Sequence, residues 1–326
     1  MNKPKVSIIT PTFNRAALIE KTIKSVLSQT YDDLDYIVVD GCSNDGTVEI
    51  LEKYARQGKL RYISEPDKGM YDAINKGLRI ATGEILAYLN SDDMYFPWTV
   101  STAVDALISK NADLVCGDTL VQTIDGKTIR INLWPKVTLA YLKTGHYIAQ
   151  PTVFMKRNVF LALGEFGCEV KLLGDCEYWL KAVEAGYRIE NLHELLAIEC
   201  NHGETLRLSL RQQIEDEKTI LRARYKPAFN NNALISFYAG MKFVEREMVY
   251  LAFKILLFQE AGNVPAWKNF RKSYLCGFNL LNYYLSKAKI ANLYDSIWRV
   301  EESPTSFDCP VQATSNARSI SENGKA

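Results

Sequence analysis

Short apolar runs alternate with segments of helical hydrophobic spacing over the first ninety residues. The apolar runs cover 6–10, 36–39, 61–64 and 85–89, and the segments of helical spacing cover 16–29, 47–54 and 70–81. Strands that are apolar on both faces and joined by helices predict βαβ units and a parallel sheet. Ligands of such sheets bind beyond the carboxyl ends of the strands, so we expect a functional site there.

Each of the four predicted strands ends in a polar segment. These segments are 10–15, 40–47, 65–69 and 90–93. The last holds two consecutive carboxylates, Asp92 and Asp93, which are costly beside a buried strand unless a cation binds them. A divalent metal that bridges a diphosphate fits this pattern, because hard oxygen ligands suit Mg²⁺ and Mn²⁺. A solvated turn or a helix cap is the alternative.

The pattern is less regular from 100 to 199. We expect a strand at 114–116, a hairpin over 121–131 that turns at Asp125-Gly126, and an extended segment at 150–154. A helix over 177–185 is expected to stop at Gly186. This half would lie over one end of the parallel sheet and supply the second wall of a cleft.

The chain becomes helical after Gly203, and basic residues are frequent between 207 and 226. A solvated helix face is the ordinary interpretation of such residues, and contact with the inner-membrane surface is a second one. Packing against the preceding domain or in a homo-oligomer is a third. We expect an α/β domain over 1–204, a helical extension over 205–302 and a disordered tail over 303–326, which is rich in Ser, Asn and Pro.

Composition narrows the class of protein. Of 326 residues 47% are apolar, which allows a substantial core, and the net charge of +1 gives no field that would recruit nucleic acid. The seven cysteines include no C-x-x-C pair, so neither a disulfide framework nor a zinc ribbon is expected. No signal peptide and no run of about 18 uncharged apolar residues is found, and we expect a cytoplasmic location.

The polar segments together resemble those of glycosyltransferase family 2. Residues 10–15, 38–47 and 89–93 match in order and spacing, and the resemblance continues through 65–77, 150–154 and 174–180. The run 65–77 is similar to the branch that makes bacterial exopolysaccharide and O-antigen. The resemblance implies an α/β fold of the GT-A (Rossmann-like) type, with a mostly parallel sheet flanked by helices. It also implies inverting, metal-dependent transfer from a nucleotide diphosphate sugar to a glycan or lipid-linked acceptor.

The resemblance assigns roles residue by residue. Residues implied to bind the donor nucleotide or its sugar are Thr10, Pro11, Thr12, Arg15, Asp40, Lys68, Asn75 and Asp92. Asp40 would accept a hydrogen bond from the uracil imide, which favours UDP, although a D-G-x-S aspartate also forms turns by itself. Asp93 and His202 would hold Mn²⁺ or Mg²⁺, and Asp175 would be the catalytic base. A helix N-cap is the alternative for Asp175.

The chain departs from the family pattern at three positions. Asn90 replaces the first acidic residue of the D-x-D triplet, Gly174 replaces the Glu before the base, and Gly41 replaces a second Asp. Because Asp93 and Asp175 are present, we still expect an active enzyme. A nucleotidylyltransferase is a weaker alternative, since segment 10–15 has no glycine. A non-catalytic nucleotide-sugar-binding module is another alternative.

Overall fold

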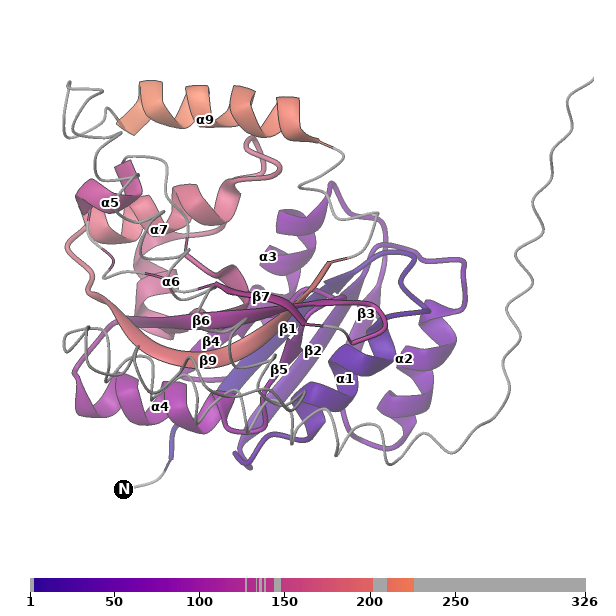
Figure 1. Cartoon of the computed structure of the whole chain (residues 1–326). Coiled ribbons are helices and arrows are strands. Elements are labelled where there is room, and N and C mark those ends of the chain that lie inside the picture. Colours follow the sequence, from indigo (N-terminus) through magenta and orange to yellow (C-terminus); the bar gives the residue numbers. More distant parts are fainter. Residues whose placement is uncertain are drawn as a thin grey trace, which may run out of the picture.

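The computed structural model describes residues 3–126, 128–132, 134, 137, 139–143, 148–201 and 210–225. The strands are β1 (Val6–Thr12), β2 (Leu34–Asp40), β3 (Arg61–Ser64), β4 (Ile85–Tyr88), β5 (Met94–Tyr95), β6 (Leu114–Thr123), β7 (Thr128–Asn132), β8 (Phe154–Lys156) and β9 (Ile189–Asn201). The helices are α1 (Ile19–Leu27), α2 (Thr47–Arg56), α3 (Met70–Ile80), α4 (Thr99–Ser109), α5 (Leu139–Lys143), α6 (Arg157–Leu163), α7 (Gly174–Glu184) and α9 (Arg211–Tyr225), and η1 (Gln150–Thr152) is a 3₁₀ turn. The predicted α/β class is confirmed (Figure 1).

One sheet runs through the described part of the chain in the order β3-β2-β1-β4-β8-β6-β9-β5, with β7 paired to β6. The pairings among β3, β2, β1 and β4 are parallel, as predicted. Beyond β4 the sheet is mixed, because β8 is antiparallel to both of its neighbours and only β6 and β9 pair in parallel. The expectation of a mostly parallel sheet therefore holds for the first half alone.

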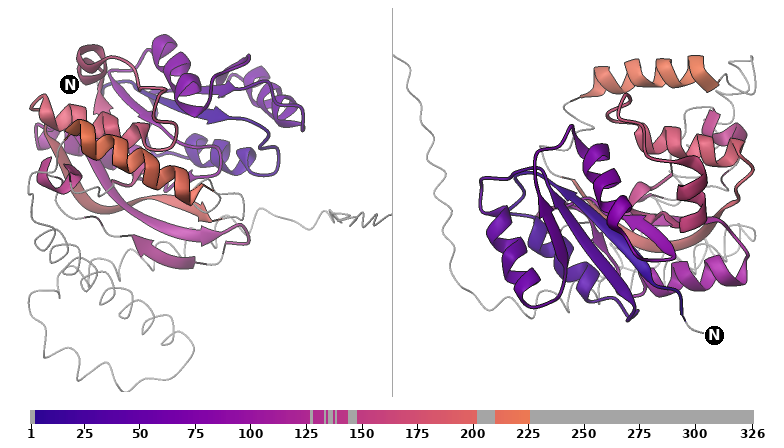
Figure 2. Two further views of the ribbon diagram at one scale, coloured as in Figure 1. Left: turned by 90° about the horizontal axis from the view of Figure 1, so that it is seen from above. Right: turned by 180° about the vertical axis from the view of Figure 1, so that it is seen from behind.

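Helices cover both faces of the sheet, and alternate strand residues point to each. Ile9, on β1, packs with the side chains of α3, α6 and α7, which form one core. Its neighbour Ile8 packs on the opposite face, with α1, α2 and α4. Figure 2 shows the two layers from behind and from above. Successive side chains of a strand point to opposite faces of the sheet. The parallel strands are apolar on both faces, and both faces are therefore buried.

Two local expectations were wrong. Residues 150–154 are not extended throughout: Pro151 lies in the 3₁₀ turn η1, and the strand begins only at Phe154. The helix expected at 177–185 begins at Gly174, because the preceding segment is fixed by contacts from a distant helix. Helix α4 and strand β9 were not predicted. The hairpin at Asp125-Gly126 is confirmed by the antiparallel pairing of β6 and β7.

Among the described residues, no helix has the length and apolar character needed to cross a bilayer. The predicted tail, most of the predicted helical extension and the basic residue Arg207 lie outside the described residues.

Candidate active site

The carboxyl ends of β1 and β2 lie side by side. Thr12 is in register with Asp40, and the main-chain N–H of Gly41 donates to the carbonyl of Thr12 at 2.9 Å. The fully buried Asp40 carboxylate accepts hydrogen bonds from the Ser43 N–H at 3.0 Å, the Ser64 hydroxyl at 2.7 Å and the Ser43 hydroxyl. Asp40 therefore shapes the loop that follows β2, as the turn-forming alternative predicts.

The loops after β1 and β2 are joined by hydrogen bonds. The Asn14 N–H donates to the Ser43 hydroxyl at 2.8 Å, and the Arg15 N–H donates to the Thr47 hydroxyl at 2.9 Å. Arg15 is half-buried beside this junction. On β1 itself, Thr10 and Pro11 are buried, and the Thr10 hydroxyl lies 3.2 Å from that of Tyr36.

Thr12 presents a different situation. Its side chain is 5% exposed, and its hydroxyl has no hydrogen-bond partner among the described residues. Buried hydroxyls are normally paired, so this group at the end of β1 is an exception.

Two residues that the resemblance implies to face the donor lie at α3: Lys68 precedes the helix and Asn75 lies within it. Lys68 is exposed, and its N–H donates to the Asp72 carboxylate at 3.0 Å. Asn75 is 2% exposed, and its amide donates to the carbonyl of Phe166 and accepts from its N–H, both at 2.9 Å. Both ends of the Asn75 side chain are thus engaged with the main chain. Asn75 therefore fixes the loop at Phe166, and its contact with the nucleotide or sugar stays a prediction.

The segment after β4 packs against the end of β9. Asp93 is 7% exposed, and its carboxylate accepts the main-chain N–H of Cys200 at 3.2 Å. Burial and the charges of Asp93 and Asp92 raise the pKa of Cys200 to about 11. Both carboxylates therefore lie close to the end of β9, the strand that leads toward His202. His202 itself lies outside the described residues.

The donor set after β4 fits a hard divalent cation that also binds substrate oxygens. No group of three or more His, Cys, Asp or Glu able to hold a metal occurs among the described residues. Mg²⁺-type ions often use only one or two carboxylates together with substrate phosphates. The side-chain carbonyl of Asn90 is buried and has no hydrogen-bond partner in the part of the chain that the structure describes, while its amide donates to Gln150 at 3.2 Å. An amide oxygen thus stands near Asp92 and Asp93, where the family carries an acid.

Asp175 lies in the first turn of α7, half-buried. One of its carboxylate oxygens accepts the N–H of Cys176 at 2.8 Å and the hydroxyl of Tyr71 at 3.2 Å. The Tyr71 hydroxyl in turn accepts the N–H of Asp175 at 3.0 Å. Burial first, and then the charge of Asp175, raises the pKa of Tyr71 well above its usual value. Tyr71 therefore remains a protonated donor to the carboxylate.

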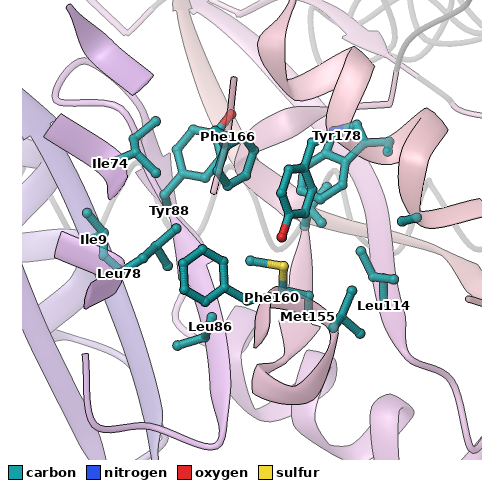
Figure 3. Packing of buried hydrophobic residues seen from close by; sticks show 14 of the residues in the cluster. Ile9, Ile74, Leu78, Leu86, Tyr88, Leu114, Met155, Phe160, Phe166 and Tyr178 are labelled. Atoms are coloured by element: carbon teal, nitrogen blue, oxygen red, sulfur yellow. The ribbon is translucent and has the colours of Figure 1, made fainter. Parts of the chain in front are cut away.

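Tyr88 connects the two ends of the site. Its hydroxyl is fully buried and has no hydrogen-bond partner among the described residues. Burial raises the pKa of Tyr88 well above its usual value, and the charges of Asp175 and, more weakly, Asp93 add to the effect. Its ring packs edge-on against Phe166, with centroids 5.6 Å apart (Figure 3). Phe166 also stacks on Tyr71, which contacts Asp175, so the end of β4 that leads to Asp93 and the start of α7 meet at one aromatic cluster.

Sequence reasoning missed Tyr71, Tyr88 and Gln150. Gln150 accepts from Asn90 and donates to the carbonyl of Tyr88 at 2.8 Å, which ties η1 to the end of β4. In the sequence the two tyrosines occupy ordinary apolar positions of a helix and a strand. Only their hydroxyl groups distinguish them from other core residues. Tyr71 and Gln150 did lie in matched segments, but nothing local indicated their contacts.

Comparison with known proteins shows the family of the chain. The model of the family "Glycosyl transferase family 2" matches residues 7–162. A PGL/p-HBAD biosynthesis glycosyltransferase of Mycobacterium tuberculosis is 31% identical over 183 residues, which cover 55% of this chain and 69% of that protein. The chain belongs to glycosyltransferase family 2, and it is a glycosyltransferase.

Solved structures share the fold. Staphylococcus aureus TarS 1–349 in complex with UDP-GlcNAc is similar with a TM-score of 0.54 and 20% identity, over 71% of this chain and 69% of that chain. Mannosyltransferase PcManGT from Pyrobaculum calidifontis, in complex with GDP-Man and Mn²⁺, is similar with a TM-score of 0.54 and 22% identity, over 90% and 88%. The fold is therefore of the GT-A type, as predicted.

Proposed function

We propose that the protein transfers a sugar, with inversion, from a nucleotide diphosphate sugar to a hydroxyl group of a glycan or lipid-linked acceptor in surface polysaccharide synthesis. One observation carries the proposal: Phe166 packs against both Tyr71, whose hydroxyl contacts Asp175, and Tyr88, at the end of the strand that leads to Asp93. A base and a diphosphate-binding carboxylate must be close together for a single displacement. The relatives of this chain include a chondroitin synthase of Escherichia coli, which supports a polysaccharide product.

The donor nucleotide is assigned to the ends of β1 and β2. We propose that the loops joined by Asn14 and Ser43 form the nucleotide site, with Thr10, Pro11, Thr12 and Arg15 on its β1 side. The unpartnered Thr12 hydroxyl would bond the ligand. A carboxylate has about four acceptor positions, and the contacts from Ser43 and Ser64 use three of those of Asp40. The fourth would accept the uracil imide, which favours UDP.

A divalent cation is proposed to be held by Asp93 and His202, with Asp92 and the Asn90 carbonyl beside it. When bound, Mn²⁺ or Mg²⁺ would offset the charge that develops on the departing diphosphate. The chain's own contribution is to hold the Asp93 carboxylate in place through the Cys200 N–H. Lys68, exposed before α3, would add positive charge beside the donor.

Asp175 is proposed to take the proton of the acceptor hydroxyl while the acceptor oxygen attacks the anomeric carbon. The bond between that carbon and the diphosphate oxygen breaks in the same displacement, so an α-linked donor gives a β-linked product. The Tyr71 hydroxyl and the Cys176 N–H hold one oxygen of the base. The Cys176 contact is also what a helix-capping aspartate makes, so the two roles require an experiment.

Asp175→Asn separates these roles, because it keeps the oxygen that Tyr71 and Cys176 bind. We expect nearly unchanged donor affinity and turnover reduced by roughly 10²- to 10⁴-fold, the usual value of a positioned base. Screening nucleotide sugars for donor hydrolysis with Mn²⁺ measures turnover, and titration with the same donor measures affinity. NMR of the product's anomeric centre gives the configuration. Normal turnover in this variant, or a product of retained configuration, would leave Asp175 as a cap only.

A further inference from the structure

Glu217, on α9, is a buried carboxylate that binds three consecutive main-chain amides. Its side chain is 5% exposed. One oxygen accepts the N–H of Lys171 at 3.1 Å, and the other accepts those of Leu172 at 2.9 Å and Leu173 at 3.0 Å. The amide of Gln213 adds a fourth contact at 3.3 Å. A buried carboxylate is tolerated only when it is hydrogen-bonded, and charge-assisted bonds of this kind are strong.

The three amides lead directly into the helix that carries Asp175. Leu173 is the residue before α7, and it has no side-chain cap of its own. Asp175 follows two residues later. Since helix starts need external partners, the course of the chain into α7 depends on a group from elsewhere. Glu217 is 42 residues from Asp175 along the chain, and it supplies that group.

A second set of contacts joins the same two helices. Glu177, in the first turn of α7, is 2% exposed and accepts hydrogen bonds from the Arg224 guanidinium and, at 3.3 Å, from the Tyr225 hydroxyl. Apolar side chains fill the space between them, namely Val170, Leu173 and Cys176 against Ile214, Leu221 and Tyr225. In Figures 1 and 2, α9 lies across the outer side of α7. Arg224 is thus paired with a residue of α7, so the basic residues of α9 do not form a purely solvated face.

We propose that Glu217 is a positioning residue for Asp175, so that α9 holds the start of α7 in the orientation that the transfer reaction needs. The inference rests on the proposed function of Asp175. Tyr71 contacts the base from the α3 side, while Glu217 fixes the main chain that precedes it. A base displaced by about 1 Å loses roughly a hundred-fold in rate, so the amide contacts affect turnover rather than donor binding.

Glu217→Gln is the test variant, because it keeps the size of the side chain and replaces one acceptor oxygen by an NH₂ group. The NH₂ group is itself a donor and cannot accept a hydrogen bond from a main-chain N–H, so at least one of the three bonds is lost. Asp216→Asn is the matched control: it removes the same charge from the neighbouring position of the same helix, where the side chain is exposed. Glu217→Asp replaces the Gln variant if the latter does not fold.

Two measurements on the full chain test the proposal. Hydrogen exchange of a peptide covering 168–178 is expected to be about ten-fold faster at residues 171–173 in Glu217→Gln than in Asp216→Asn, the usual effect of losing a charged hydrogen bond. Turnover is expected to fall roughly ten- to a hundred-fold, with the donor KM and the Kd of UDP unchanged. Unchanged exchange, or wild-type turnover in Glu217→Gln, would overturn the proposal. A wild-type chain inactive with every donor would instead contradict the proposed function.

Discussion

The hydroxyl of Tyr71 acts on Asp175 twice, as a donor to its carboxylate and as an acceptor for its N–H. Tyr71→Phe removes both bonds and keeps the ring. We expect turnover about ten-fold lower and stability lower by about 1–2 kcal/mol, since a buried N–H loses its acceptor. Donor affinity should not change. Steady-state kinetics and UDP titration test this, with Tyr62→Phe on β3 as the control.

The pH dependence of this effect follows from the pKa of Tyr71. Burial and the charge of Asp175 raise that pKa well above 10, so the folded state favours the neutral hydroxyl. For a raised pKa, the contribution of the protonated form is fully present below the usual pKa of about 10 and is lost only as the pH rises through the folded value. The ratio of wild-type to Tyr71→Phe turnover should therefore be constant from pH 6 to pH 10. A ratio that falls to one by pH 10 would contradict this role.

Asp93 carries the prediction about the metal. Asp93→Asn keeps an oxygen for the Cys200 N–H and removes the charge, so the fold should be retained. We expect Mn²⁺-dependent turnover to fall by roughly a hundred-fold or more, since offsetting charge on the leaving group is worth several kcal/mol. Calorimetric titration of UDP with Mn²⁺ and with a chelator measures the coupling between metal and nucleotide. Asp105→Asn, on the exposed side of α4, is the control, and equal coupling in both variants would exclude Asp93 as a ligand.

At the scale of elements, the close approach of α3 and α7 explains one departure from the family pattern. A Cβ at Gly174 would lie 2.7 Å from Cε2 of Tyr71 and 2.9 Å from two further ring atoms. The ring also stacks on Phe166, with centroids 5.9 Å apart. A glutamate before the base would therefore collide with the tyrosine that contacts the base.

Gly174→Ala is accordingly expected to cost about 1–3 kcal/mol of stability, as overpacking of a core does. Turnover should fall as well, because the Tyr71 hydroxyl must move away from Asp175. In a Tyr71→Ala background the ring is gone, and adding Gly174→Ala should cost nothing further. Thermal unfolding of the four proteins gives the coupling. Equal costs of Gly174→Ala in both backgrounds would show that Tyr71 is not the obstacle.

The sequence pattern predicted those elements whose side chains are uniformly apolar or clearly periodic. Strands β1, β2 and β4 are short apolar runs, and the polar segments after them do meet at one edge. Helix α4, Thr99–Ser109, was missed because its threonines and valines are β-branched and typical of strands. The contact of Tyr71 with Asp175 spans 104 residues, and no local pattern predicts such a pairing.

At the scale of the whole molecule, the contacts of α9 change the proposed division of the chain. A boundary at 204 separates Glu217 and Arg224 from the main chain and the Glu177 carboxylate that they bind. Glu177 is buried, and a buried carboxylate that loses hydrogen-bond donors destabilises the fold. We therefore propose that the catalytic domain extends through Tyr225 and that a helical extension begins after it.

This boundary sharpens the prediction about the membrane. The sequence beyond 225 is rich in aromatic and aliphatic residues and is interrupted by charges such as Lys242, Glu245 and Lys254. We predict that these segments bind at a bilayer surface rather than span it. We expect the full chain to sediment with vesicles that contain anionic lipid, and more weakly at high salt. A chain that ends at 225 should still bind the donor and should no longer sediment with the vesicles.

Ending the chain at 225 rather than at 204 makes the comparison interpretable. A chain that ends at 204 lacks Arg224, the partner of the buried Glu177, so any loss of vesicle binding could come from unfolding. UDP affinity and the unfolding temperature of the 1–225 protein are the controls, and both should match those of the full chain. If that protein sediments with anionic vesicles as strongly as the full chain does, the segment beyond 225 is not the membrane contact. The exposed Arg222 on α9 would then be the first residue to replace.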